Sequence, residues 1–302
     1  MATLTTAAKA DAPRPAEPGP DFMCVGLQKG GTRWLYDQLD GHEDFWMPPK
    51  KELHYFDDEF PKRDLTRYAR KLFSGDDADR RASPKRGGGE LDTQALEFYA
   101  EVLKHPGGRH DLEAYRRLFA MKGGKLSGDV TPGYSTLDAP TIEMLAEAFP
   151  KLRICLLLRD PVSRLWSHWR MRCEKQENPE AAEQKFAPFE RFIQRPSVIA
   201  RSYPSQIAAR WSSAFGDRFR YFFLEDVSAR PEELTAEIVS FLGGDPAKPS
   251  TVSSDFNRKA KTRSAPRSPE VQTVMRRLFE DERAICAKQF GGAAEKWPSL
   301  PY

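Results

Sequence analysis

The feature that most constrains the fold is an apolar run, LRICLLL, at residues 152–158. Apart from Arg153 it contains no charged or polar side chain, so it lacks the alternation expected of a strand with one face in water. Such a run predicts a strand that is buried on both faces, as in the centre of a parallel sheet. Because parallel strands need crossover connections, helices are expected to cover both faces of that sheet.

Two other apolar segments are predicted to be buried strands of the same sheet: FMCVGL at 22–27 and FRYFFLED at 219–226. KLSGDVTPGYS, at 125–135, is predicted to be a turn-rich connection. Helices are expected at 32–41 with Gly41 as C-cap, and at 93–104, 111–120, 139–150, 162–171 and 231–244. Strands that alternate with helices predict an α/β fold with a doubly wound, mostly parallel central sheet flanked by helices.

The length of 302 residues and the hydrophobic fraction of 39% are enough for one large α/β domain with a full core. We expect a single domain over residues 21–302, preceded by a disordered tail at 1–20 that is rich in Ala and Pro. The charged, glycine-rich stretch at 74–92 is predicted to be a mobile surface loop. No apolar run approaches the roughly 18 residues that cross a membrane, and the tail lacks the apolar centre of a signal peptide.

Charge and cysteine content argue against several classes of function. The formal net charge of +3 argues against a nucleic acid-binding protein driven by bulk charge, so any anion site must be a local cluster. The four cysteines form no CxxC pair, and Cys24 and Cys155 lie in apolar runs. That pattern favours buried free thiols and a reducing, cytoplasmic location. No cluster has metal-ligand spacing, so no metal is expected.

The sequence CVGLQKGGTRW, residues 24–34, leads from the first predicted strand into the first predicted helix. In a doubly wound sheet, ligands bind beyond the carboxyl ends of the strands, where this loop lies. Gly30 and Gly31 let backbone N–H groups approach an anion, and the helix start adds its positive end. Lys29 and Thr32 offer an amine and a hydroxyl. The pattern predicts a phosphate-binding loop, with an ordinary glycine turn as the alternative.

An arginine and a serine follow the central strand in LLLRDPVSRLWSHW. Arg159 comes directly after the strand, at the same expected ligand edge, and Ser167 comes eight residues later on the next predicted helix. A guanidinium fork and a hydroxyl placed in this way are suited to a second phosphate. A strand-end arginine that pairs with a carboxylate is the alternative.

Two further segments carry candidate groups. KKELHYFDD, at 50–58, combines Glu52, His54 and Asp57 with aromatic residues, a mixture that can supply a general base and its supports; a solvated charged face is the alternative. NRKAKTRSAPRS, at 257–268, is strongly basic and loop-like. It is a candidate lid over a phosphate, with plain solvated surface as the alternative.

Taken together, these segments resemble the sulfotransferases that use 3′-phosphoadenosine 5′-phosphosulfate, PAPS. LQKGGTRWLYDQL and LLLRDPVSRLWSHW look like that family's two cofactor-binding blocks: Lys-x-Gly-Thr followed by Trp, and an arginine after a strand followed by Pro and Ser. KELHYFD, SGDVTPGYS, SYPSQIAARW, YFFLEDVSARPEEL and FLGG extend the likeness over most of residues 22–297. The resemblance is closest to the glycosaminoglycan branch, such as the heparan sulfate sulfotransferases, where GGTR and Glu-x-His-x-Phe-Asp occur together.

The resemblance implies a PAPS-dependent enzyme with the P-loop-like fold of that family and adenosine 3′,5′-bisphosphate as a product. It implies in-line transfer of the sulfo group to a hydroxyl or amine of a small-molecule or saccharide acceptor, without a metal. Glu52 matches the family's general base, and His54 is its support or the alternative base. His54 and Asp57 match residues that position the acceptor. The implied cofactor contacts are Lys29, Gly30, Gly31, Thr32 and Arg33 for the 5′-phosphosulfate, Trp34 for the adenine, and Arg159, Ser167, Lys261 and Arg263 for the 3′-phosphate.

Two positions depart from the family pattern. Thr262 replaces the glycine of the family's Lys-Gly-Arg, and Val130 stands where the glycosaminoglycan enzymes often carry a lysine. The valine implies either another base or a different acceptor, so heparan sulfate is not assumed; the few cysteines and lack of a membrane anchor suit a bacterial-type cytoplasmic enzyme. Two other functions stay open. One is a P-loop kinase or NTPase, although G-x-x-x-x-G-K-[ST] is missing, and the other is a non-catalytic anion- or glycan-binding protein.

Overall fold

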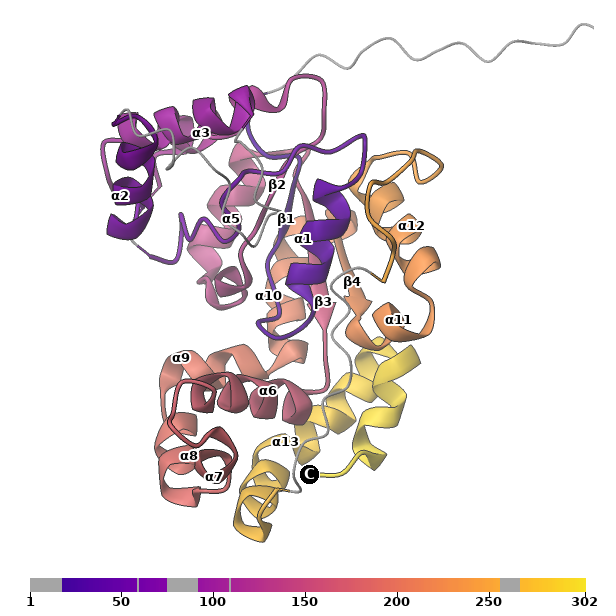
Figure 1. Ribbon diagram of the computed structural model, residues 1–302. Coiled ribbons are helices and arrows are strands. Elements are labelled where there is room, and N and C mark those ends of the chain that lie inside the picture. The colour runs from indigo at the N-terminus through magenta and orange to yellow at the C-terminus, as the bar shows by residue number, and fades with distance from the viewer. Residues whose placement is uncertain (1–17, 59, 75–91, 109, 256–266) are drawn as a thin grey trace, which may run out of the picture.

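The computed structural model describes residues 18–58, 60–74, 92–108, 110–255 and 267–302 (Figure 1). Within these residues, four parallel strands form a central sheet in the order β2-β1-β3-β4. The strands are β1 (Phe22–Cys24), β2 (Gly128–Val130), β3 (Arg153–Leu158) and β4 (Phe219–Phe223). The predicted α/β class with a parallel central sheet is confirmed.

β3 is the central strand that the apolar run predicted. Its side chains alternate between two hydrophobic clusters, with Ile154, Leu156 and Leu158 in one and Cys155 and Leu157 in the other. All five are fully buried. Because both faces of the strand meet the core, neither face needs polar side chains, which explains the missing alternation.

The outer strands differ from the sequence-based prediction. β2 forms inside the segment 125–135 that was predicted to be a connection, and it pairs with β1 with Gly128 opposite Phe22. The segment 219–226 was predicted to be one buried strand, but β4 ends at Phe223, and only its last two residues are buried. A strand at the sheet edge has fewer neighbours to cover it, which accounts for the exposed start of β4.

Helices cover both faces of the sheet, as the doubly wound prediction requires. On one face, α5 (Ala139–Ala148) and α10 (Pro204–Phe215) contribute to the first cluster. On the other face, α1 (Thr32–Asp40) and α12 (Pro231–Leu242) contribute to the second. Gly41 is the C-cap of α1, as predicted, and its backbone N–H donates to the carbonyl of Asp37.

A third cluster lies away from the sheet, in the lower part of Figure 1. It joins α6 (Pro161–Cys173), α7 (Pro179–Glu183), α8 (Phe186–Ile193) and α9 (Pro196–Ile199) to the long α13 (Pro269–Phe290), which was not among the predicted helices. The remaining α-helices are α2 (Arg63–Leu72), α3 (Thr93–Lys104), α4 (Leu112–Arg117) and α11 (Leu224–Ala229); the 3₁₀ helices are η3 (Ala120–Lys122), η4 (Pro132–Thr136), η5 (Ala200–Ser202), η6 (Gly216–Arg218) and η7 (Gly292–Ser299).

Some predictions fall on residues outside the described part of the chain. They are most of the tail at 1–20, of the loop at 74–92 and of the basic segment at 257–268, including Lys261 and Arg263. All four cysteines are free and buried. Within the described residues, no helix combines the length and the apolar character that a membrane span requires.

Candidate functional site

The loop between β1 and α1 packs directly onto the end of β3. The backbone N–H of Leu27 donates to the carbonyl of Leu157 over 2.9 Å, which brings the loop against the central strand. A Cβ atom on Gly30 would lie 2.7 Å from that same carbonyl oxygen, so a side chain at this position would collide with backbone. Gly31 has a φ of 97°, a left-handed conformation that favours glycine. Both glycines are therefore required by the path of the loop.

The start of α1 is suited to an anion. Gly31 is its N-cap, and no side chain of the described residues caps the helix there. The first N–H groups of a helix lack partners within the helix and carry its positive end. Thr32, the first helical residue, is buried, so its side chain is covered by the surrounding protein rather than exposed to solvent. The predicted anion-binding features of the loop thus occur together at one helix terminus.

Arg159 and Lys29, from the two predicted cofactor blocks, meet at this edge of the sheet. Nη1 of Arg159 donates to the backbone carbonyl of Lys29 over 2.7 Å. Burial lowers the pKa of the Arg159 guanidinium below its usual value. The next residue, Asp160, accepts from Nε of Arg283 over 2.7 Å and from the backbone N–H of Ser163 over 2.8 Å, which fixes the start of α6. The alternative from the sequence was that Arg159 pairs only with a carboxylate. The hydrogen bond to the Lys29 carbonyl is an additional contact, which that alternative does not include.

Ser167 lies further along α6 and is half-buried. It is on the same helix that Asp160 anchors to α13, so the strand end and this serine belong to one connected unit. A contact between Ser167 and a phosphate stays a prediction.

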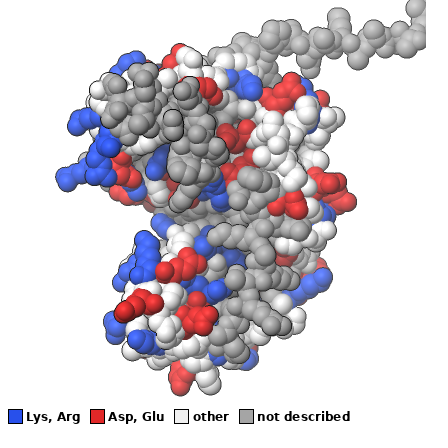
Figure 2. Space-filling view, in the orientation of Figure 1, with Lys and Arg blue, Asp and Glu red and all other residues white. Residues whose placement is uncertain are grey.

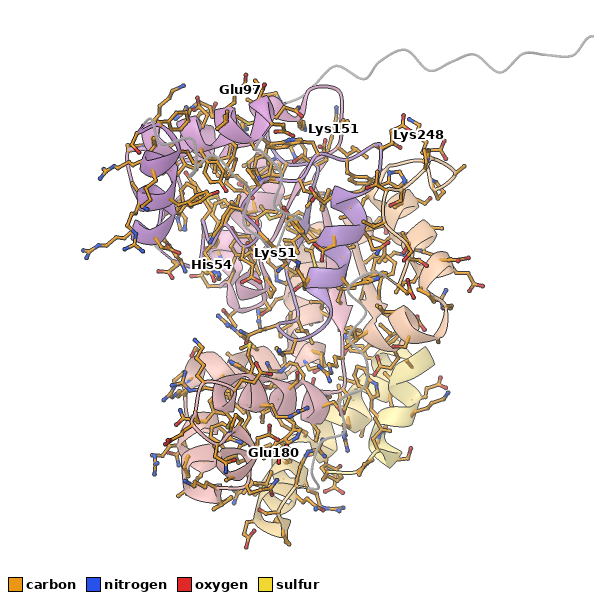
Figure 3. The ribbon with its side chains drawn as sticks, viewed as in Figure 1. Lys51, His54, Glu97, Lys151, Glu180 and Lys248 are labelled. Carbon is orange, nitrogen blue, oxygen red and sulfur yellow. The ribbon has the colours of Figure 1, made fainter. Side chains whose placement is uncertain are left out.

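The segment at 50–58 places its acidic residues and histidine in contact. Nδ1 of His54 lies 3.0 Å from both carboxylate oxygens of Asp57, and its Nε2 lies 3.6 Å from Oε2 of Glu52. Nζ of Lys51 lies 2.6 Å from Oε1 of Glu52 and 3.5 Å from Oγ1 of Thr32. Lys51 therefore joins this segment to the start of α1. Figure 3 shows Lys51 and His54 at the edge of the upper part of the molecule that faces α6 and α9.

These contacts set the charge states of Glu52 and His54. Burial by itself raises the pKa of Glu52, but the interactions with His54 and Lys51 outweigh it and lower that pKa to about 2. The hydrogen bond with Asp57, and then the ion pair with Glu52, raise the pKa of His54 to about 9 against the effect of burial. At neutral pH the carboxylate is ionised and the imidazole is protonated.

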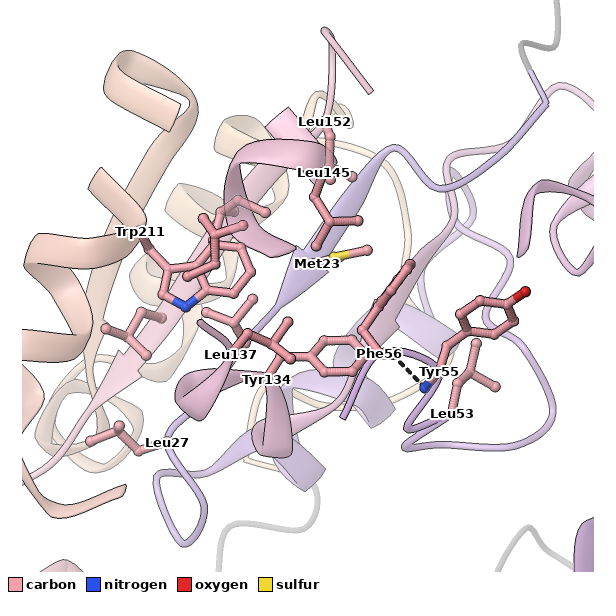
Figure 4. Packing of buried hydrophobic residues seen from close by; sticks show 14 of the residues in the cluster. Met23, Leu27, Leu53, Tyr55, Phe56, Tyr134, Leu137, Leu145, Leu152 and Trp211 are labelled. Carbon is pink, nitrogen blue, oxygen red and sulfur yellow. Dashed lines mark hydrogen bonds between the residues drawn. The ribbon is translucent and has the colours of Figure 1, made fainter. Parts of the chain in front are cut away.

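A buried hydrogen-bond network supports this segment, and Figure 4 shows its bond between Tyr134 and the backbone of Tyr55. The hydroxyl of Tyr134 donates to Asp129 over 2.7 Å and accepts from the backbone N–H of Tyr55 over 2.9 Å. Gly133 lies against Asp57 so closely that a Cβ atom would come within 2.0 Å of its carboxylate. The η4 turn thus contacts this segment at Tyr55 and at Asp57.

Backbone conformation singles out three of the predicted catalytic residues independently. Among the described non-glycine residues, four have a positive φ: Lys29, Glu52, His54 and His110. The values for Lys29, Glu52 and His54 are 68°, 64° and 58°. Left-handed conformations at non-glycine residues cost on the order of 1 kcal/mol or more and gather at functional sites. The fold holds these three residues in place against that cost.

Two of the predicted cofactor residues, Trp34 and Arg33, have side chains that contact other parts of the protein. The side chain of Trp34 is buried in the second cluster, and its Nε1 donates to the carbonyl of Ser254 over 2.7 Å. Nε of Arg33 lies 2.9 Å from the carboxylate of Asp37, one turn further along α1. Stacking of Trp34 on an adenine stays a prediction, and the proposal below does not use it.

Lys51 was not predicted, although it stands in the segment that drew attention. A lysine beside a glutamate is common on protein surfaces, so the sequence alone gives it no weight. The sequence does contain one indication. Lys51 directly precedes Glu52 and follows the glycine loop with Thr32, so it stands between the two motifs along the chain. The described residues contain no group of three or more His, Cys, Asp or Glu side chains that is arranged to hold a metal ion.

Solved structures with a similar fold are sulfotransferases. A sulfotransferase from Alicyclobacillus acidocaldarius aligns with a TM-score of 0.58 and 20% identity, over 92% of this chain and 98% of that one. One from Mycobacterium avium aligns at 0.49 and 14%, over 91% and 78%. The sulfotransferase domain of the Synechococcus PCC 7002 olefin synthase aligns at 0.46 and 16%, over 88% and 96%. No curated protein matches the chain.

The sequence itself also matches a family pattern. The pattern of the sulfotransferase family covers residues 20–246, which is most of the chain. That span includes the glycine loop, the segment with Glu52 and His54, and the end of β3 with Arg159. These are the parts that the fold brings to one edge of the sheet. The chain therefore belongs to the sulfotransferase family.

Proposed function

We propose that the chain transfers the sulfo group of PAPS to a hydroxyl or amine of a small-molecule or saccharide acceptor, with Glu52 as general base. The observation that carries this proposal is the position of Lys51 between Glu52 and Thr32. It places the predicted base next to the predicted anion loop. Arg159, which donates a hydrogen bond to the carbonyl of Lys29, adds a second cation at that loop.

The residues at the site fit such a cofactor. A Cβ atom on Gly30 would collide with backbone, so the loop is built around a bare backbone. The uncapped start of α1 offers N–H groups to a 5′-phosphosulfate, and Lys29, Thr32 and Lys51 add charge and a hydroxyl. Arg159 and Ser167 would hold the 3′-phosphate. When bound, PAPS supplies an activated sulfo group whose leaving group is a phosphate.

Glu52 is the better placed of the two candidate bases. At neutral pH His54 carries a proton, because its pKa is raised to about 9, so it has no lone pair to accept one. Glu52 is ionised, and its side chain is 42% exposed, which leaves it accessible to an acceptor. The protonated His54, held by Asp57, orients the Glu52 carboxylate.

Lys51 ties the strength of the base to the presence of an anion. In the structure its amine lies 2.6 Å from Glu52, which weakens that carboxylate as a base. An anion at the loop competes for the same amine, because Lys51 is also 3.5 Å from Thr32. Any withdrawal of Lys51 from Glu52 raises the pKa of Glu52 and makes it a stronger base. Lys29 would stabilise the negative charge that develops on the departing phosphate.

The valine that departs from the family pattern does not face this site. Val130 lies on β2 opposite Cys24, is 2% exposed and belongs to the second hydrophobic cluster. No charged group is expected from this position, and Lys51 supplies an amine beside Glu52 instead. The resemblance to the glycosaminoglycan branch stays a hypothesis that depends on the loop and the Glu-x-His-x-Phe-Asp stretch, and heparan sulfate is not assumed as the acceptor.

Two experiments test the proposal. Calorimetry without metal should show binding of adenosine 3′,5′-bisphosphate, whereas a kinase or NTPase would prefer ATP with Mg²⁺. A PAPS-dependent screen of saccharides, phenols, alcohols and amines should then show the mass of one added sulfo group. Absence of both signals would overturn the proposal, and binding without transfer would favour a non-catalytic protein.

The role of Glu52 is tested by the substitution Glu52→Ala. It should abolish transfer while leaving the affinity for adenosine 3′,5′-bisphosphate within a few-fold. Asp58→Ala is the matched control, because Asp58 is an exposed carboxylate of the same segment. Full turnover by the Glu52 variant would remove this residue from the mechanism.

A further inference from the structure

The solvent-facing side of α2 is lined by basic side chains. Its opposite side packs into the first hydrophobic cluster through Leu65, Ala69 and Leu72. Four exposed basic residues have the spacing that places side chains on one face of a helix: Arg63, Arg67, Arg70 and Lys71. We refer to these four residues as the cationic stripe.

The charge of the cationic stripe is not cancelled by its described surroundings. None of its three arginines forms an ion pair with another described residue, and Asp64 is the one acidic residue of α2. The nearby Asp58 pairs with Lys62 instead, over 2.8 Å. The sequence that follows, residues 75–91, has four acidic and four basic side chains and so adds no net charge. The stripe therefore presents a net positive charge to solvent.

A hollow of about 540 Å³ lies along the cationic stripe. Its wall consists of the four basic residues together with Pro61, Thr66 and Ser74. Guanidinium groups and hydroxyls are donors that suit phosphate oxygens. At the end of the helix stands Phe73, which is 47% exposed and is the one exposed aromatic side chain among the described residues. The surface thus combines cations, a hollow of the size of a small ligand and an aromatic ring in water.

The cationic stripe lies apart from the groups assigned to the donor. α2 packs against α3, at the left of the upper part of Figure 1, whereas α1 and β3 lie in the centre. Figure 2 shows Lys and Arg side chains gathered at this left margin. Burial lowers the pKa of Arg159, and the charges that counter it are those of Glu225 and Asp160, neither of which is on α2. The two phosphates of the donor therefore do not account for the stripe.

An anionic lipid surface is the partner that these features fit best. A stable protein interface has an apolar centre surrounded by polar residues, but here the hollow is mainly cationic and Phe73 lies at its end. Four or more basic residues on one helix attract anionic lipids, and an exposed aromatic ring beside them suits the headgroup region. We propose that the cationic stripe and Phe73 bind the surface of an anionic membrane, with the phosphate of a lipid headgroup in the hollow.

Binding in this way brings the candidate site to the membrane. Pro61, in the wall of the hollow, follows the segment that carries Glu52 and His54, and Lys62 reaches back to Asp58 in that segment. Figure 3 shows His54 close to α2. Acceptors at a lipid surface are then within reach of Glu52. The membrane contact itself does not depend on sulfotransfer, and it is measured without any nucleotide, so either proposal can fail alone.

The first measurement is cosedimentation of the full chain with lipid vesicles at low salt. One set of vesicles is phosphatidylcholine, and the other has equal parts of phosphatidylcholine and the anionic phosphatidylglycerol. We expect binding to the mixed vesicles alone. Binding should weaken as salt is added, because the screening length shortens to about 8 Å at physiological ionic strength. No binding to the mixed vesicles, or equal binding to both sets, would overturn the proposal.

The second measurement removes two charges from the cationic stripe. The double variant Arg67→Gln, Arg70→Gln changes exposed side chains only, so the fold should be kept. Arg277→Gln, Lys288→Gln is the matched control, because it removes the same charge from exposed positions on α13. The first should bind mixed vesicles about 30-fold more weakly, as expected for two cations lost at an anionic surface, and the control within about twofold. Equal losses would show that net charge alone drives binding.

The third measurement separates a membrane from a soluble polyanion. Phe73→Ser removes the exposed ring and keeps all four cations of the stripe. It should weaken binding to mixed vesicles but leave binding to heparin, a soluble polyanion, at the level of wild type. Unchanged binding of Phe73→Ser to the vesicles would remove the membrane as the partner and leave the stripe to soluble polyanions.

Discussion

Nη1 of Arg159 donates a hydrogen bond of 2.7 Å to the backbone carbonyl of Lys29. The bond joins the end of β3 to the glycine loop, so the two segments that resemble cofactor-binding blocks form one surface. Under the proposed function Arg159 would have two tasks: it holds the loop through this bond, and its remaining donors would meet the 3′-phosphate. The tasks differ in which nucleotide they affect.

Arg159→Ala should weaken the binding of adenosine 3′,5′-bisphosphate more than that of 5′-AMP, because only the first nucleotide carries the 3′-phosphate. A charged hydrogen bond contributes about 1.5–3 kcal/mol, so the affinity for the bisphosphate should fall about 10- to 100-fold. Calorimetry with both nucleotides measures the two effects. Equal losses for both would show that Arg159 only braces the loop.

Lys51→Met should make the enzyme more sensitive to acid. Lys51 helps to lower the pKa of Glu52 to about 2, so its removal lets burial raise that pKa. A general base works only above its pKa, so the acid limb of kcat/KM against pH should move upward by about one unit or more. The acid limb of Lys51→Met should therefore begin at a higher pH than that of wild type, while activity at pH 8 should not change through this effect.

Lys50→Met is the control for this prediction, because it removes the neighbouring lysine and leaves the contact of Lys51 with Glu52 intact. An unmoved acid limb in Lys51→Met would show that the lysine does not tune the base. A loss of activity by the same factor at every pH would assign Lys51 to donor binding alone.

Asp57→Asn should lower the pKa of His54. The hydrogen bond with Asp57 is the largest cause of the raised value of about 9, against an ordinary value of 6.5. An NMR titration of His54 should show its midpoint moving down by at least about one unit, and Asp58→Asn should leave it in place. An unchanged midpoint in Asp57→Asn would contradict the assignment.

The same shift predicts how stability depends on pH. A raised folded-state pKa contributes stability that is fully present below pH 6.5 and is lost as pH rises through about 9. Thermal unfolding of wild type should therefore weaken over that window more than unfolding of Asp57→Asn. If His54 must be protonated to orient Glu52, activity declines above about pH 9 in wild type and at lower pH in the variant.

Much of the sheet and of the site was predictable, because local pattern and burial agree there. β3 is buried on both faces, and its apolar run without alternation predicts this burial. β2 was missed because three residues between turn signals carry no pattern; they form a strand by pairing with β1. The end of β4 was misjudged because Leu224 continues the apolar run, while Glu225 and Asp226 behind it suit the first turn of a helix.

In the site, too, some features follow from the sequence pattern and others only from tertiary packing. The glycine loop and Arg159 follow strands, so topology alone brings them to one edge. The contacts of Lys51 with Glu52 and Thr32 depend on tertiary packing that no spacing encodes.

The left-handed backbone of Lys29 provides a last test, which separates stability from activity. Lys29→Ala and Lys29→Gly both remove the amine, and both should slow transfer by at least about 100-fold, the scale of losing one donor to a developing anion. They should differ in stability. At a φ of 68° alanine retains the steric cost of the left-handed region and glycine does not. Lys29→Gly should therefore be more stable than Lys29→Ala by about 1 kcal/mol, a few degrees in Tm.

The usual order at exposed positions is the reverse, since glycine lowers stability by raising the entropy of the unfolded chain. A higher Tm for the glycine variant thus reports directly on the conformation of residue 29. Equal or lower stability of Lys29→Gly would mean that the loop relaxes when the lysine is lost. In that case the left-handed conformation is maintained by the lysine side chain rather than imposed by the fold.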